Sequence, residues 1–412
     1  MKKYILIFLY AIIMLTHGER STEKMRFLVF FTIFTLIYSS MHLYGFIKAK
    51  NALSLGHGVS IGLGIFLVIM IFCPFLVRLF QGKNFELIRL ILAYAGYTWM
   101  AFIFLFFCIS LATDICKGAA YIIGILSKGY GHTFLLSPTL VFLGNILLAT
   151  LIICYGFVEA ANIRTERITI QSPKVPAKPG KITIVQVSDI HLGLIVRGKR
   201  LEKIVKAVKN ANPDILVSTG DLIDAQINNA EPFLQQFRSI TTAYGKYAVT
   251  GNHEFYCGID QAVDLTKEAG FQLLRGELIK IPGVLNIAGI DDPAGKSFGH
   301  KGNITEEQLL STLPDDRFTI LLKHRPTLHK ASAGLFDLQI SGHSHKGQIF
   351  PFSLIIKLLY PVDSGLLKLN DNGLLYVSRG AGTWGPPIRF LAPPEIALFT
   401  LIHGPWDIRV TD

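Results

Sequence analysis

The chain has 412 residues, of which 50% are hydrophobic and 17% charged, and its mean hydropathy is +0.43. This composition excludes an ordinary soluble globule. A net charge of +11 often indicates nucleic-acid binding. Here residues 1–162 hold 12 Lys and Arg against 5 Asp and Glu, and much of this excess lies in loops that flank apolar segments. The charge is therefore better explained by those flanks than by nucleic-acid binding.

Four apolar runs in the first part of the chain are long enough to cross a membrane, which takes about 20 helical residues. They are residues 27–47, 59–79, 90–111 and 135–158. A weaker run at 4–15 follows two lysines; it is a fifth helix, a signal-peptide core, or the product of a start assigned ahead of Met25. Ionisable residues lie near predicted helix ends or in loops, Asp114 among the latter, which favours an anchor over a transport pathway. We therefore predict a transmembrane helical region at 1–162.

The loops between four such helices differ in positive charge. One side carries eight Lys and Arg and the other carries four. The first set is Arg20, Lys24, Arg26, Arg78, Lys83, Arg89, Arg164 and Arg167, and the second is Lys48, Lys50, Lys117 and Lys128. Because cytoplasmic loops carry the excess, we expect the carboxy-terminal part to lie in the cytosol, at an inner or plasma membrane.

A proline-rich stretch separates the two parts. Residues 171–180 contain three prolines and a glycine, which is typical of a semi-rigid connector, and we place a linker at 163–180. Residues 163–412 hold 28 Lys and Arg against 24 Asp and Glu, a balance typical of a soluble domain. Cys257 is the one cysteine of this part, so the domain forms no internal disulfide, consistent with a reducing compartment.

Strands and helices alternate beyond the linker. Strands are predicted at 182–188, 214–219, 246–250, 284–290, 318–323, 337–341, 374–378 and 395–401, and helices at 201–209, 232–240, 261–269 and 304–310. This alternation predicts an α/β domain whose sheets are covered by helices.

Five polar motifs follow the ends of these strands. They are Asp189-Ile190-His191, Gly220-Asp221, Gly251-Asn252-His253-Glu254, the single His324, and Gly342-His343-Ser344-His345. A spacing of two puts both side chains on one side of an extended chain. The donors are enough for two cations, and nitrogen and oxygen ligands without thiolate favour Mn, Fe, Zn or Co. Two such ions about 3.5–4 Å apart can activate water and hold a phosphate, so phosphate esters are the expected substrates.

These motifs, in this order over residues 184–401, resemble the signature of the calcineurin-like metallophosphoesterases. The resemblance implies that Asp189, His191, Asp221 and His345 hold one ion, and that Asp221, Asn252, His324 and His343 hold the other, with Asp221 bridging. It implies that His253 is not a ligand and instead stabilises the phosphate or protonates the leaving oxygen. The implied fold, over residues 181–412, is a two-sheet β-sandwich flanked by helices.

A narrower resemblance is to the membrane-attached bacterial branch of this family. That branch usually follows its last motif with Gly-Gly-Gln, where this chain has Lys346-Gly347-Gln348. Residues 382–387 and 392–395 also resemble the branch. Some members of the branch hydrolyse the pyrophosphate of UDP-2,3-diacylglucosamine, and others are known only as generic phosphoesterases. From the membrane anchor and the apolar segment 350–369 we predict a lipid-linked or nucleotide-linked substrate at the membrane surface.

Several residues near the motifs keep two interpretations. The apolar segment 350–369 is either a lipid-facing lip beside the site or a buried loop. Arg379 and Arg389 are candidate phosphate contacts. Asp224 reads as a turn carboxylate rather than a partner of His191, and Glu254 is ambiguous.

Two rival functions are weighed against hydrolysis at the membrane. A tethered nuclease or nucleotide phosphodiesterase would use a basic stripe, but the lysines between 199 and 209 have helical spacing and no interleaved aromatics, so nucleic acid is not the expected partner. A non-enzymatic scaffold or channel with a vestigial domain is disfavoured by the intact ligand set. The oligomeric state does not follow from the sequence.

Overall fold

The computed structural model describes two compact units, Met1–Leu79 with Ala95–Ile152, and Phe80–Tyr94 with Ile153–Asp412. The described residues are 21–77, 79–80, 85–126, 137–224, 230–300, 302, 304–314, 316–369 and 373–411. The weak apolar run at 4–15 lies outside them.

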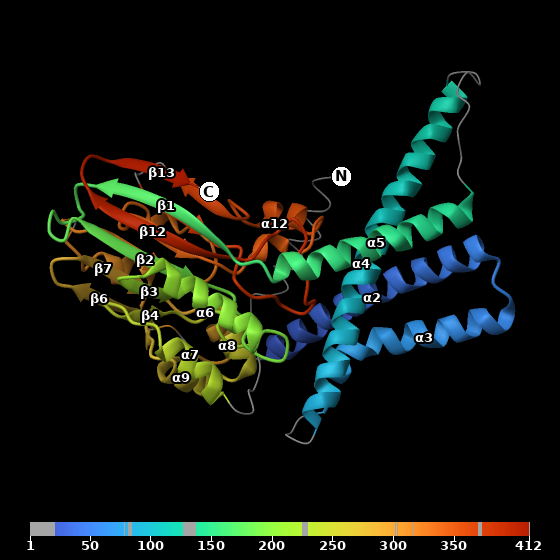
Figure 1. Cartoon of the computed structure of the whole chain (residues 1–412), viewed down its shortest axis with the longest axis horizontal. Coiled ribbons are helices and arrows are strands. Elements are labelled where there is room, and N and C mark those ends of the chain that lie inside the picture. Colours follow the sequence, from blue (N-terminus) through green and yellow to red (C-terminus); the bar gives the residue numbers. More distant parts are fainter. Residues whose placement is uncertain are drawn as a thin grey trace. The chain divides into compact units, whose positions relative to one another are not determined.

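The first unit is built from long helices. They are α2 (Ser21–Leu53), α3 (His57–Leu76), most of α4 (Glu86–Leu126) and most of α5 (Pro138–Ala160), and they correspond to the four predicted apolar runs (Figure 1). Among the described residues, α3, α4 and α5 are long and apolar enough to cross a membrane. The run at 27–47 is helical, and its crossing stays a prediction.

Several polar side chains of this unit pair with one another. Asn145 donates to the hydroxyl of Ser110 at 3.0 Å. Asp114 was expected in a loop but lies in α4, where its carboxylate is 2.5 Å from the Lys48 ammonium. The sequence did not predict these pairs, and the role of the helices as an anchor stays a prediction.

The second unit contains two mixed sheets that pack face to face. The larger sheet has the order β13 (Asp407–Thr411), β1 (Arg164–Ser172), β12 (Glu395–His403), β2 (Lys181–Val187), β3 (Ile215–Ser218), β4 (Lys246–Ala248) and β5 (Gln272–Leu273). The smaller has the order β10 (Gly365–Lys368), β11 (Leu374–Val377), β9 (Leu338–Ser341), β8 (Thr319–Leu322), β7 (Leu285–Gly289) and β6 (Glu277–Ile281). One buried apolar cluster joins them, with Ile184 and Val217 from one sheet and Ile320 and Ile340 from the other.

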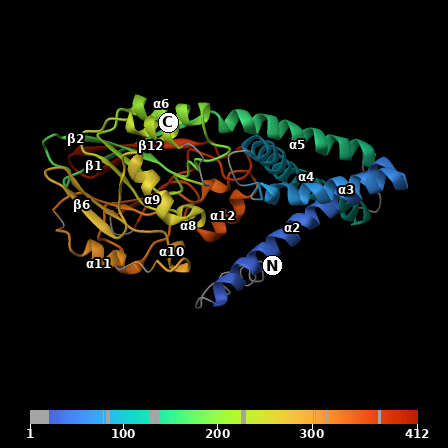
Figure 2. The ribbon, with the colours of Figure 1, turned by 90° about the horizontal axis from the view of Figure 1, so that it is seen from below.

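Helices cover the outer faces of the two sheets. They are α6 (Lys199–Ala211), α7 (Glu231–Arg238), α8 (Asn252–Cys257), α9 (Ile259–Glu268), α10 (Ala294–Ser297), α11 (Glu306–Leu310) and α12 (Ser353–Leu359), with 3-10 turns η2 (Lys330–Ser332) and η3 (His345–Gly347). Figure 2 shows α6 on one face and α10 and α11 on the other, with strands between them. The predicted fold, a two-sheet sandwich flanked by helices and preceded by apolar helices, is confirmed.

The structure differs from the sequence prediction at the linker, and it excludes one of the two interpretations of segment 350–369. The expected linker at 163–180 contains β1, which pairs in parallel with β12 and antiparallel with β13, so the connector beyond it is shorter. The segment 350–369 is not a buried loop, because it forms α12 and β10 and exposes most of the apolar side chains of α12.

Candidate metal centre

The candidate ligands lie where both sheets present the carboxyl ends of parallel strands. In the larger sheet, Asp189 follows β2, Asp221 follows β3, and Asn252 opens α8 after β4; these three strands are parallel neighbours. In the smaller sheet, His324 follows β8 and His343 follows β9, which is parallel to β8. The backbone N–H of His343 donates to the Asp189 carboxylate at 3.0 Å, which joins the two sets.

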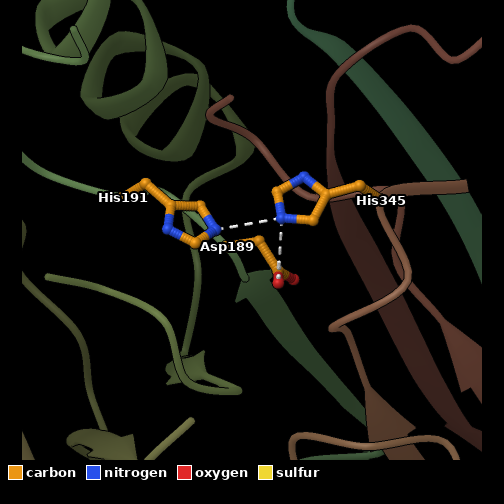
Figure 3. Close-up of side chains that lie close together, drawn as sticks. All are labelled: Asp189, His191 and His345. Carbon is orange, nitrogen blue, oxygen red and sulfur yellow. Dashed lines mark hydrogen bonds and ion pairs between the residues drawn. The ribbon is translucent and has the colours of Figure 1, made fainter. Parts of the chain in front are cut away.

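One group of donors consists of Asp189, His191 and His345. The Nε2 atoms of the two histidines are 2.9 Å apart, and Nε2 of His345 lies 3.4 Å from Oδ1 of Asp189. Figure 3 shows the three side chains pointing toward one another, Asp189 and His191 from the segment after β2 and His345 from the segment after β9. Their ligand atoms all lie within 4.8 Å of one another, close enough to bind a single cation.

A second group consists of Asp221, His324 and His343, with Asn252 beside it. Nε2 of His324 is 3.2 Å from Oδ2 of Asp221, 3.1 Å from Nδ1 of His343 and 3.2 Å from Oδ1 of Asn252. The same Oδ2 of Asp221 is 3.8 Å from Nε2 of His191, so Asp221 adjoins both groups. The structure thus brings all seven predicted ligands together, with Asp221 between the two groups.

The electrostatics of the cluster suit a cation. Burial and neighbouring positive charge hold the pKa values of His343 and His345 well below the usual range, which leaves neutral imidazoles with a free lone pair. Burial alone would lower the pKa of His324, but the Asp221 carboxylate raises it to about 10. A divalent cation would take the place of that proton, because metal ligands bind in their deprotonated forms.

Most of the candidate ligands have an uncommon backbone conformation. Five of the seven have positive φ: Asp189 at 51°, His191 at 52°, Asp221 at 51°, His343 at 70° and His345 at 48°. An L-residue in this left-handed region is destabilised by about 1–2 kcal/mol. Such outliers collect at functional sites; here they lie in the segments that carry the ligands from the strand ends to the centre.

Glu254 organises the loops that carry the ligands. Its buried carboxylate accepts hydrogen bonds from the backbone N–H groups of Asp221, Leu222, Ile223 and Gly251, at 2.7–3.1 Å. A Cβ atom on Gly251 would overlap the Asp221 carboxylate, so only glycine allows this close approach. The ambiguity of Glu254 is resolved: it supports the loops and is not among the grouped donors.

His253 lies beside these two groups and, with His191 and Asp221, forms a third set whose ligand atoms lie within 4.8 Å of one another. A second carboxylate, that of Asp224, also holds it. Its ring lies 4.7 Å from the ring of His191, and its Nδ1 is 2.6 Å from Oδ1 of Asp224. Burial alone would lower the pKa of His253, but the charges of Asp221 and Asp224 raise it to about 9. Asp224 also lies 3.4 Å from Nδ1 of His191. The interpretation of Asp224 as an ordinary turn carboxylate was therefore wrong; the signal was its position three residues after Asp221.

The two arginines proposed as phosphate contacts are already engaged. Arg389 has no exposed surface, donates to four backbone carbonyls, and places Nη2 3.1 Å from Nδ1 of His345. Arg379 pairs with the carboxylates of Glu166 and Glu395. Both stabilise the segment after β11, so the phosphate-contact hypothesis is replaced by a structural role.

Aromatic rings surround the mouth of the cluster. The ring of Trp384 is 5.7 Å from that of His253, and the ring of Tyr256 is 5.4 Å from it. Both residues are exposed, at 54% and 56%. Tyr360, which directly follows α12, lies edge-on to His343 at 5.8 Å. Sequence reasoning singled out the segments that contain Tyr360 and Trp384 but did not predict that these rings, with that of Tyr256, approach the histidines, because the three come from segments that no motif connects.

Several known proteins are similar to this chain. The sequence model of the calcineurin-like phosphoesterases matches residues 182–347. An uncharacterised metallophosphoesterase of Aquifex aeolicus is 37% identical over 255 residues, which cover 62% of this chain and 97% of the relative. One of Campylobacter jejuni is 31% identical over 318 residues, or 75% of this chain and 83% of the relative. A transmembrane protein with a metallophosphoesterase domain of Danio rerio is 29% identical over 270 residues, or 62% and 61% of the two chains.

Proposed function

The chain belongs to the metallophosphoesterase family, and we propose that it is a membrane-anchored hydrolase that cleaves a phosphodiester or pyrophosphate bond with two divalent cations. The observation that carries this proposal is the set of three donor groups that are joined through His191 and Asp221, one of which includes His253. Two adjacent cation sites and a nearby imidazole are the parts that phosphate-ester hydrolysis requires.

The residues fit the two ions by number and by chemistry. Asp189, His191 and His345 would hold one ion and Asn252, His324 and His343 the other, with Asp221 shared between them. The donors are carboxylate, amide and imidazole groups, which suit Mn, Fe, Zn or Co. When bound, such a pair supplies an activated water and neutralises the charge of the phosphate.

His253 and Asp224 complete the proposed chemistry. The Nδ1 atom of His253 faces Asp224, which leaves Nε2 to protonate the departing oxygen or to donate to a phosphate oxygen. Asp224 holds the ring in this orientation and favours its protonated form. His253 is thus proposed as the catalytic residue, and Asp224 as a positioning residue that acts through it.

The membrane helices support the proposed location. The second unit includes the start of α4 and the end of α5, so the sandwich is continuous with two helices that are long and apolar enough to cross a membrane. The Arg197 guanidinium is 2.5 Å from the Glu86 carboxylate in the first turn of α4. The attachment of the sandwich to the start of α4 and the end of α5, together with the excess of positive charge in the loops on that side, supports a cytosolic catalytic unit. We propose a lipid-linked or nucleotide-linked substrate at the cytosolic membrane surface.

Hydrolysis by the purified full-length chain tests the proposal. With Mn²⁺, it should release p-nitrophenol from bis-p-nitrophenyl phosphate. Asn252→Ala and His253→Ala should each lower kcat by about 100-fold or more, because each removes a proposed ligand or acid. His329→Ala is the matched control, since that side chain is 61% exposed.

Two results would contradict the proposal. Full activity in Asn252→Ala or His253→Ala would show that the site assignment is wrong. Mass spectrometry should find about two transition ions per chain. A chain with less than one tightly bound ion and no turnover would instead be the non-enzymatic scaffold.

A further inference from the structure

An exposed apolar surface lies directly after the last ligand motif. The helix α12 buries Ser353 and Ile356 and exposes most of its other side chains. The exposed apolar residues are Phe350 at 39%, Phe352 at 43%, Leu354 at 54%, Ile355 at 40%, Leu358 at 49% and Leu359 at 42%. We call these six residues the α12 surface. Contiguous apolar surface of this kind marks a binding face.

The α12 surface is fixed relative to the metal centre at both of its ends. It begins three residues after η3, where a Cβ atom on Gly347 would come within 2.5 Å of the backbone nitrogen of Ser353. It ends at Tyr360, whose ring contacts His343. The hydroxyl of Ser344 also donates to the carbonyl of Asp363 at 2.7 Å. A group bound to the α12 surface therefore has a set position relative to the ligands.

Within the second unit, contacts connect the α12 surface to the end of helix α5. The backbone N–H of Arg389 donates to the carbonyl of Gly156 on α5 at 3.1 Å, and a Cβ on Gly156 would lie 2.9 Å from the Arg389 oxygen. The next residue, Phe390, has its ring 6.2 Å from that of Tyr155, and its carbonyl accepts from the N–H of Phe350 at 3.0 Å. One chain of contacts thus runs from the end of α5 to the start of the α12 surface.

The chemistry of the surface matches a bilayer interface. Its exposed side chains are aliphatic or phenyl groups, and Lys357 stands among them with its side chain 60% exposed. Lysine at the margin of an apolar face is typical of elements that lie in the headgroup region. Trp384 is half exposed nearby, and its backbone is held by the amide of Gln348. Tryptophan is enriched at membrane surfaces.

We propose that the α12 surface inserts into the adjacent lipid leaflet and that the metal centre takes its phosphate ester from a membrane-embedded, acyl-bearing substrate. This inference rests on the proposed hydrolase function and adds the route of the substrate. The phosphate of a lipid lies at headgroup depth, next to the inserted side chains. The acyl part can stay in the bilayer while the phosphate reaches the ligands beside Tyr360.

Photocrosslinking of the full-length chain tests the contact with lipid. The photoreactive residue benzoylphenylalanine would replace Leu354 or Leu358, with Val410 as the control, since Val410 is 57% exposed on the edge strand β13. The chain would be reconstituted in vesicles of phosphatidylcholine and phosphatidylglycerol. Lipid adducts at 354 and 358 should exceed those at 410 by on the order of tenfold. Equal adducts at the three positions, or adducts with a second protein chain alone, would overturn the proposal.

Two substrates that share the same reacting phosphodiester distinguish a failure of the membrane route from a failure of the hydrolase function. Ethyl p-nitrophenyl phosphate is soluble, and hexadecyl p-nitrophenyl phosphate resides in the vesicles. The double variant Leu354→Asp with Leu358→Asp should lose about tenfold or more on the hexadecyl ester and keep its rate on the ethyl ester; Val410→Asp should change neither. Equal rates of the double variant and the wild type on the hexadecyl ester would overturn the membrane route. A wild type that hydrolyses neither ester would refute the hydrolase function, while the crosslinks would still decide the lipid contact.

Discussion

Replacing Asp224 should slow hydrolysis without removing the metal ions. The Asp224 carboxylate is 2.6 Å from Nδ1 of His253 and 3.4 Å from Nδ1 of His191, and it touches none of the predicted ligand atoms that face the centre. Its removal leaves the donor groups intact but frees the ring of His253. The change therefore probes the orientation and protonation of His253, and the bound metal content reports any effect through His191.

The expected size of the effect follows from the kind of hydrogen bond. A hydrogen bond to a charged group stabilises by about 1.5–3 kcal/mol, and each 1.36 kcal/mol, roughly, is a factor of about ten in rate. Asp224→Asn keeps an acceptor and loses the charge, so we expect a fall in kcat of about tenfold. Asp224→Ala loses both, so the fall should approach about a hundredfold.

The assay compares aryl phosphodiesters whose leaving groups differ in basicity. If His253 protonates the leaving oxygen, the loss in Asp224→Asn should be small for p-nitrophenolate and grow as the leaving group becomes more basic. In a His253→Gln background, Asp224→Asn should have no further effect, because it acts through the same ring. Additive losses in the double variant would refute the reasoning. A fall in bound metal would mean that Asp224 acts through His191 instead.

Three further outcomes are expected. Asp221→Asn should lower bound transition metal to less than about one ion per chain and abolish turnover, because both donor groups adjoin this carboxylate. Mass spectrometry measures the metal, and the bis-p-nitrophenyl phosphate assay measures turnover. Retention of both ions would contradict the shared role of Asp221. Gly251→Ala should likewise reduce metal binding, since the added Cβ overlaps Asp221, whereas Gly302→Ala should be neutral because no atom lies within 4 Å of its added Cβ. Trp384→Ala should raise KM for aryl substrates by about tenfold or less and leave metal content unchanged, because the exposed ring borders His253; an unchanged KM would exclude that contact.

The paired sheets and the location of the site were predictable from local patterns. Short buried strands such as 182–188 and 214–219 each end at a polar motif, and parallel neighbours present their carboxyl ends at one edge. The family resemblance supplied the second sheet and the order of the ligands. The strands and the motifs at their ends depend on local sequence, and they could therefore be predicted.

Elements whose partners are distant in sequence were harder to predict. The strand β1 pairs with β12, so that Thr169 faces Thr400, and nothing near 164–172 indicates that partner. The prolines that follow β1 made the whole stretch resemble a connector. The short helix α12 was ambiguous for another reason: its apolar residues suit burial and membrane contact equally, and only their exposure distinguishes the two.

The site residues show the same division between motif and context. The seven proposed ligands could be named from the sequence because each stands in a recognisable motif, and the structure places their side chains together. The roles of Asp224 and Arg389 depend on what their side chains meet in space, which is a histidine ring for one and backbone carbonyls for the other. Charge and residue type alone assigned both incorrectly.

The left-handed backbone of five ligands has a consequence for how this sequence can change over time. Each such residue is destabilising by about 1–2 kcal/mol, and glycine at the same position would relieve that strain. A domain kept only as a scaffold would therefore gain stability by losing its ligands, and random substitution would favour their loss. This chain has a ligand-type side chain at all seven proposed positions, which is what we expect if the proposed metal-dependent chemistry outweighs the gain in stability.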